Sequence, residues 1–128
     1  MSVIIAEAAF AFGNVNRVQI DHVPNSLAFR TALTPALVDQ RARIHLDTRD
    51  PVLLGRIVTA LEHTAVTGDA RASDLRYAIR LRDARGIVRA TLYLDAFGVR
   101  GVLDGRRVRF ESDAIKRAIV AACASLAR

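Results

Sequence analysis

Three turn-forming segments divide the second half of the chain into short, evenly spaced stretches. Residues 83–86 and 95–98 each begin with Asp and end with Gly, and residues 104–105 are the Asp-Gly dipeptide that favours a two-residue hairpin. Between these segments apolar and polar side chains alternate, as expected of strands with one buried face. The sequence therefore predicts a four-stranded antiparallel meander over residues 75–110.

The same turns predict the register of the meander, if these segments are the whole of their loops. Apolar side chains then face one another across each pair of strands. The predicted pairs are Leu81 with Val88, Ile79 with Ala90, Tyr77 with Leu92 and Leu75 with Leu94, then Leu94 with Val99 and Leu92 with Gly101, and finally Gly101 with Val108 and Val99 with Phe110. A slip of one residue would send a strand's apolar side chains to water, so turns that agree on one apolar face support the assignment.

The opposite face of the meander is predicted to carry seven arginines and a tyrosine, beside small and apolar residues. We call these eight residues the arginine face: Arg76, Arg80, Arg82, Arg89, Tyr93, Arg100, Arg107 and Arg109. In the predicted register Arg80 lies opposite Arg89 and Arg100 opposite Arg109, which is unfavourable for a sheet selected for stability alone. Two interpretations follow: a surface that binds an anionic partner, or the solvated side of an antiparallel sheet.

The first half of the chain predicts further strands and a helix. Alternating stretches lie around Val18 and Ile20 and over residues 42–47, Leu27 to Leu33 share one parity, and residues 3–12 fit a strand somewhat better than a helix. Asp50 followed by Pro51 is a helix start, and an apolar stripe continues to about His63. Residues 64–74 are small and polar, which favours a loop within the same domain.

Ser112 and the apolar stripe after it predict a terminal helix over about residues 113–127 that covers the apolar face of the meander. The predicted fold class is therefore α+β, with a mostly antiparallel sheet packed by two helices, at about 51–63 and 113–127. With 128 residues, of which 52% are hydrophobic and 25% charged, the chain is expected to form a single globular domain, 1–128.

Composition indicates the cellular location of the protein and where its charge lies. We find no secretory signal and no apolar stretch long enough to span a bilayer, and Cys123 is the single cysteine, so a reducing, cytoplasmic location is expected. Residues 1–64 hold 6 basic and 6 acidic side chains, whereas residues 65–128 hold 13 and 7, so the net charge of +6 lies in the second half. The preference for arginine over lysine is typical of a GC-rich bacterial genome.

The side chains that carry most enzyme chemistry form no recognisable motif. His22, His45 and His63 fall on different predicted elements without metal-ligand spacing, and Cys123 lies in a helix stripe where a small core residue is expected. The candidate carboxylate pairs are Asp47 with Asp50 and Asp95 with Asp104, all of which suit capping or turn positions. We therefore expect no metal, no cofactor and no enzymatic activity.

The segment Leu92 to Phe110, LYLDAFGVRGVLDGRRVRF, resembles a β-turn-β-turn-β pattern of small bacterial proteins, among them immunity-type proteins of toxin systems. This resemblance implies an inhibitor that neutralises one toxin by protein–protein contact, here through the arginine face. The alternative hypothesis is a nucleic-acid-binding module that uses the same arginines against phosphates. Tyr93 could then stack on a base, although a sheet that reads RNA usually presents two or more aromatic side chains.

Overall fold

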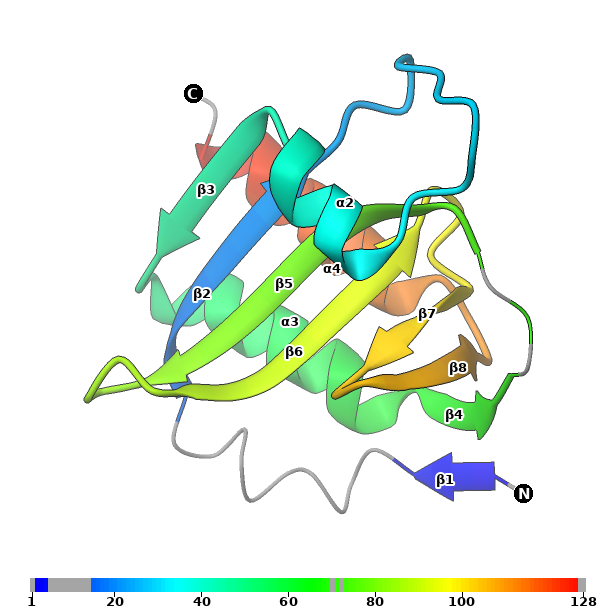
Figure 1. The fold of residues 1–128 in the computed structure, drawn as a ribbon. Coiled ribbons are helices and arrows are strands. Elements are labelled where there is room, and N and C mark those ends of the chain that lie inside the picture. The colour runs from blue at the N-terminus through cyan, green and yellow to red at the C-terminus, as the bar shows by residue number, and fades with distance from the viewer. Residues whose placement is uncertain (1, 5–14, 70, 72, 127–128) are drawn as a thin grey trace.

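The computed structural model describes residues 2–4, 15–69, 71 and 73–126. These residues form one eight-stranded antiparallel sheet in the order β1-β4-β8-β7-β6-β5-β2-β3, with three helices (Figure 1). The strands are β1 (Ser2–Ile4), β2 (Val15–His22), β3 (Ile44–Thr48), β4 (Ala65–Gly68), β5 (Leu75–Asp83), β6 (Val88–Asp95), β7 (Arg100–Leu103) and β8 (Arg106–Phe110); the helices are α2 (Pro35–Arg41), α3 (Pro51–His63) and α4 (Ala114–Leu126). The predicted α+β class is confirmed.

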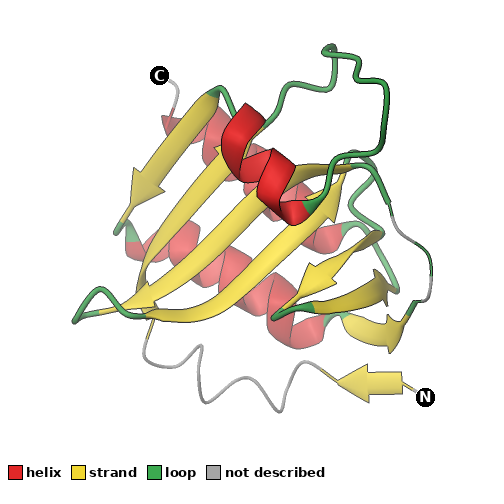
Figure 2. Ribbon diagram, in the orientation of Figure 1, coloured by secondary structure: helices red, strands yellow, loops and turns green. Residues whose placement is uncertain are grey.

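The sheet has one fully covered face and one partly covered face. Helices α3 and α4 lie side by side behind the sheet, whereas the shorter α2 crosses the front of β5 and leaves β7 and β8 uncovered (Figure 2). The main core lies between the sheet and the two long helices. Its fully buried side chains include Val18, Ile20, Ile57, Leu61, Ile79, Leu94, Phe110, Ile115 and Ile119.

Local sequence signals set the ends of the two long helices. The Asp50 side chain accepts a hydrogen bond from the amide of Val52 at 2.9 Å, and Pro51 occupies the first turn of α3, where no amide donor is needed. Ser112 accepts a longer bond of 3.3 Å from Ala114 at the start of α4. Both predicted helices are confirmed to within a residue at each described end. Within the described residues, no helix has the length and apolar character needed to cross a membrane.

The predicted meander is confirmed as β5 to β8, with the tightest turn as expected. Asp104 and Gly105 have φ of 48° and 84°, the left-handed conformations of a two-residue hairpin turn, and Gly101 pairs with Val108 as predicted. The two wider turns shift the other registers by two residues, so that Ile79 faces Leu92 and Leu94 faces Gly101. An even shift preserves which side chains share a face, so the apolar face survives from Tyr77 onward. The predicted pairing of Leu75 with Leu94 is wrong, because a bulge pairs Leu75 with Asp95 and Leu75 packs with Tyr93 in a second apolar cluster.

Aspartate side chains cause both shifts by stabilising loops that are longer than predicted. Asp83 accepts from the amides of Arg85 and Ile87, and a bulge then places Val88 opposite Arg82 before regular pairing resumes. At the next turn one Asp95 oxygen accepts from Gly98 at 2.7 Å and from Val99 at 3.1 Å. Each carboxylate thus stabilises a loop that is longer than its turn-forming residues alone would predict.

Gly101 allows an unusually close approach between β6 and β7. A Cβ atom at this position would lie 1.8 Å from the carbonyl oxygen of Tyr93, on the neighbouring strand. The obstructing atom belongs to the backbone and cannot rotate away, so a side chain here would force the two strands apart. A glycine is therefore required where the central strands meet the β7–β8 hairpin.

The first half of the chain agrees in part with the sequence predictions. The strands expected around Val18 and over residues 42–47 are confirmed as β2 and β3. The parity of residues 27–33 does not mark a strand, because this segment is an irregular loop that leads into α2, where Pro35 begins a helix capped by Thr34. Residues 65–68 form β4 between β1 and β8 instead of a loop. Of the segment 3–12, residues 3–4 belong to β1 and 5–12 lie outside the described residues.

Candidate functional site

The opposed arginine pairs of the arginine face change with the register. Arg100 and Arg109 face each other across β7 and β8, as predicted. The predicted pairing of Arg80 with Arg89 is wrong, because the bulge leaves Arg89 outside the ladder and Thr91 lies opposite Arg80. Arg89 instead bonds the Asp83 carboxylate at 2.8 Å, and Arg82 bonds Gln19 on β2 and the carbonyl of Gly86.

At one end of the face, Arg76 and Tyr93 are covered by α2 and the loop that precedes it. The side chain of Arg76 donates to the carbonyls of Pro24 and Leu27 at 3.1 and 2.7 Å, and its guanidinium carbon lies 5.3 Å from the centre of the Phe29 ring. Arg76 is only 7% exposed. With its two bonds to Asp74, the guanidinium makes four hydrogen bonds from its five N–H donors, and it holds the loop against the sheet.

Asp74 bonds both the side chain of Arg76 and the end of the loop that precedes α2. Its carboxylate accepts from Arg76 at 2.8 and 3.1 Å through one oxygen, and from the amide of Leu33 at 2.8 Å through the other. The amide of Leu75 in turn donates to the carbonyl of Leu33 at 3.2 Å. Residues 33 and 74–76 therefore join the covering loop to the start of β5.

Asp39 on α2 joins this helix to Arg80 and Tyr93. Arg80 donates to Asp39 and to the Tyr93 hydroxyl, both at 2.9 Å, and that hydroxyl donates to the other Asp39 oxygen at 3.0 Å. Asp21 on β2 lies 3.3 Å from Arg80 on its other side. Burial opposes the charge of Arg80, but Asp39, Tyr93 and Asp21 outweigh it, so the pKa of Arg80 is raised.

We call Arg76, Arg80 and Tyr93 the covered end of the arginine face, and Arg100, Arg107 and Arg109 on β7 and β8 its open end. Arg107 and Arg109 are exposed, and the side chain of Arg109 forms no ion pair or hydrogen bond with any described residue. Arg100 lies 3.1 Å from Asp69, but their facing atoms are not aligned for a hydrogen bond. Within the described chain the charge of Arg109 at the open end is therefore less fully compensated than the charges of Arg76 and Arg80 at the covered end.

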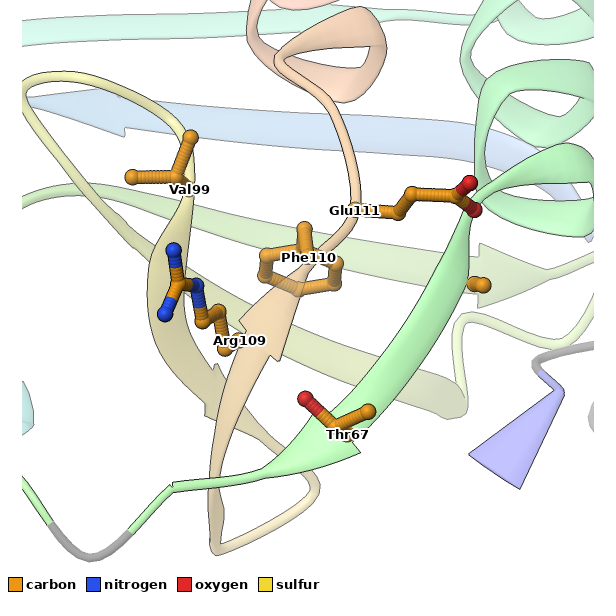
Figure 3. A pocket seen from close by; sticks show the side chains of 6 residues that line it. Thr67, Val99, Arg109, Phe110 and Glu111 are labelled. Carbon is orange, nitrogen blue, oxygen red and sulfur yellow. The ribbon is translucent and has the colours of Figure 1, made fainter. Parts of the chain in front are cut away.

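A shallow hollow of about 520 Å³ lies beside Arg109, where β4 and β8 meet the turn before β7. Figure 3 shows the Arg109 guanidinium beside Val99, with the Phe110 ring between Arg109 and Glu111 and with Thr67 below the ring. Thr67 faces Arg109 directly across β4 and β8. The hollow thus combines a cation, a hydroxyl and a carboxylate around a short apolar floor, a mixture that suits contact with a polar protein surface.

The histidines and the cysteine lie apart from this face or at its margin, and they do not converge. His22 stacks on Tyr77 with ring centres 4.1 Å apart, His45 lies 2.6 Å from Asp21, and His63 ends α3. Cys123 is partly buried against the core, and burial raises the pKa of its thiol. No group of three or more His, Cys, Asp or Glu side chains in the described ranges is placed to hold a metal ion.

Sequence reasoning found the arginines but missed the carboxylates that compensate several of them. Asp39 lies on α2, a helix that the pattern of residues 27–35 did not suggest, and Asp74 was assigned to a loop without a partner. The order Thr34-Pro35 is the one local signal that could have revealed the helix start. A comparison of the chain with family models, curated proteins and solved structures finds no match.

Proposed function

We propose that the protein is a non-enzymatic binding protein of the immunity type, which neutralises a toxin in the cytoplasm by covering an acidic surface of that toxin. The open end of the arginine face is the contact site. The observation that supports this proposal is the direct opposition of Arg100, which has Asp69 as a partner, and Arg109, which is exposed and forms no ion pair with a described residue. An acidic partner would relieve this repulsion.

The arginines of the covered end are less suitable for binding a partner than Arg109. Arg80 has two carboxylates and Arg76 has one, so these side chains are already satisfied within the fold. A partner would gain little there, because it would first have to displace α2. At Arg109 a partner carboxylate displaces only water, and the neighbouring hollow gives room for the side chain that carries it.

The alternative is a nucleic-acid-binding module that uses the same open end. Tyr93, the aromatic member of the arginine face, is 7% exposed and bonded to Asp39, so it offers no free ring for base stacking. Phosphate contacts by arginine would remain possible. Burial of Tyr93 therefore favours a protein partner.

Charge reversal at Arg109 tests the proposal. The tagged chain, an Arg109→Glu variant and an Arg85→Glu variant are expressed in the cells that make the protein, cross-linked and captured, and co-purifying proteins are identified by mass spectrometry. Arg85 is a matched control because it is an exposed turn arginine far from β8. We expect one acidic protein to be captured by the wild type and by Arg85→Glu, and about tenfold less by Arg109→Glu.

The captured protein must also behave as a toxin. Expressed alone it should arrest growth, and co-expression of the wild-type chain, but not of Arg109→Glu, should restore growth. Equal capture by both variants would overturn the site, and a captured protein without toxicity would overturn the immunity function. Capture of RNA or DNA, with affinity that falls steeply as salt rises, would favour the nucleic-acid alternative.

A further inference from the structure

Strand β3 forms one edge of the sheet. It pairs with β2 over five residue pairs, and in the described part of the chain no strand lies along its other side. An edge strand leaves a row of backbone N–H and C=O groups without partners in the sheet, and a second extended chain can bind to them as an added strand. This edge lies at the opposite end of the sheet order from β8 and β4, so it is separate from the open end of the arginine face.

The side chains of β3 favour such an addition more than they prevent it. Natural edges are often protected by proline or by charged side chains, especially lysine, and β3 contains neither proline nor lysine. Here the polar side chains are His45 and Asp47, and both have partners on β2: Asp21 lies 2.6 Å from His45, and Arg17 donates to Asp47 through its Nε at 2.8 Å. Both side chains are thus held by residues of β2, and Ile44 remains 39% exposed at the start of the strand.

The two residues that flank β3 carry charges with weaker compensation. Arg43 and Arg49 are exposed, and neither side chain forms an ion pair or hydrogen bond with a residue of the described chain. Arg49 acts on Asp47 only through its longer-range field, which helps to lower the pKa of that carboxyl after the larger effects of Arg17. The edge therefore presents a short apolar and backbone surface between two cations.

We propose that β3 binds an acidic, extended segment of a partner protein as an added antiparallel strand. Apolar residues of that segment lie beside Ile44 and Leu46, and acidic residues at its two ends lie opposite Arg43 and Arg49. Backbone hydrogen bonds supply the affinity, and the terminal charges select the sequence and the register. The inference goes beyond the proposed function, because it uses a different edge and neither requires the other.

A second copy of the chain fits this edge less well than an acidic strand. In the antiparallel register that overlaps the two copies of β3 fully, Arg43 of each copy lies opposite Arg49 of the other, which sets like charges together at both ends. A register centred on His45 would place Arg43 opposite Asp47, but that carboxylate already accepts two hydrogen bonds from the Nε of Arg17 at 2.8 and 3.0 Å. Charge complementarity thus favours a partner with acidic ends.

A synthetic peptide tests the proposal with the whole folded chain. The probe is Glu-Val-Thr-Val-Thr-Val-Glu, which places valines beside residues 44, 46 and 48 and glutamates opposite residues 43 and 49. Binding is followed by NMR of the isotopically labelled protein. We expect shifts concentrated over residues 43–49 and the paired part of β2, with no change over residues 100–109. A peptide with the same side chains and N-methylated backbone amides should not bind, because it cannot complete the ladder.

Variants of opposite charge, in the peptide and in the protein, provide a second test. A peptide with lysine in place of both glutamates should bind the wild type about tenfold more weakly, and the Arg43→Glu/Arg49→Glu variant should reverse this preference. An Arg56→Glu/Arg85→Glu variant is the matched control and should behave as the wild type. Arg109→Glu should also bind the acidic peptide normally, which separates this site from the open end.

Three results would overturn the inference. Equal binding of the acidic and lysine peptides would remove the selectivity, and equal binding of the N-methylated peptide would remove the added strand. Shifts over residues 100–109 instead of 43–49 would move the site to the arginine face. A stable dimer in sedimentation velocity that is lost in the Arg43→Glu/Arg49→Glu variant, together with no peptide binding, would assign the edge to a second copy.

Discussion

The covered and open ends of the arginine face contain the same side chain in opposite situations. At the covered end Arg76 is 7% exposed and is bonded to Asp74 and to two backbone carbonyls, whereas Arg109 at the open end is exposed with no such partner in the described chain. Carboxylates on β2 and α2 also hold Arg80. The number of arginines on a sheet face therefore does not measure the charge available to a partner, because some of these arginines already form hydrogen bonds and ion pairs within the fold.

Replacement of Arg76 should have the largest effect on stability. Arg76→Ala removes the donor to the carbonyls of Pro24 and Leu27. The Pro24 carbonyl keeps the amide of Leu27 at 3.1 Å, whereas the Leu27 carbonyl loses the donor that holds it under the loop. We expect the free energy of unfolding to fall by about 3 kcal/mol, as for loss of one member of a buried charged network. Urea denaturation measures it. Arg109→Ala should change the free energy of unfolding by no more than about 0.5 kcal/mol. Equal losses in the two variants would show that Arg109 is as structural as Arg76.

Replacement of Asp39 should have an intermediate effect confined to α2. Asp39→Asn weakens the bonds that Arg80 and Tyr93 donate to this side chain, which is itself 39% exposed, so we expect a loss of about 1 kcal/mol in the free energy of unfolding. Amide hydrogen exchange should quicken over residues 35–41 while the meander keeps its protection. Unchanged exchange in α2 would show that apolar contacts, such as that of Val38, hold this helix without Asp39.

Acid titration of Asp83 should give the smallest effect. Burial alone would raise the pKa of Asp83, but the amides of Ile87 and Arg85 and the Arg89 side chain outweigh it and hold the pKa below its ordinary value of 3.8. A carboxyl whose pKa is lower in the folded state adds stability above about pH 4, and that stability is lost as the pH falls through the folded pKa. The difference in urea midpoint between wild type and Asp83→Asn should therefore shrink from about pH 5 to pH 2. A constant difference would show that Asp83 acts without its charge.

Much of the fold could be predicted because its signals are local. Asp50 with Pro51, the Asp-Gly turn at 104–105 and the alternation over residues 75–110 each specify their element through neighbouring atoms. The register could not be predicted, because Asp83 and Asp95 bond amides up to five residues further on and lengthen their loops. A sequence pattern also could not predict which arginines remain available to a partner. That depends on the position of α2, whose Asp39 binds Arg80 although the two residues are 41 positions apart in the chain.

The order of strands in the sheet has a consequence for the synthesis of the chain. Strands that end by residue 68 supply both flanks, β1 with β4 at one side and β3 with β2 at the other, while β5 to β8 lie between them. A ribosome makes the flanks before the centre, so the two outer pairs emerge without the strands that join them. The sheet becomes continuous only when β8 reaches β4, after residue 110 has left the exit tunnel.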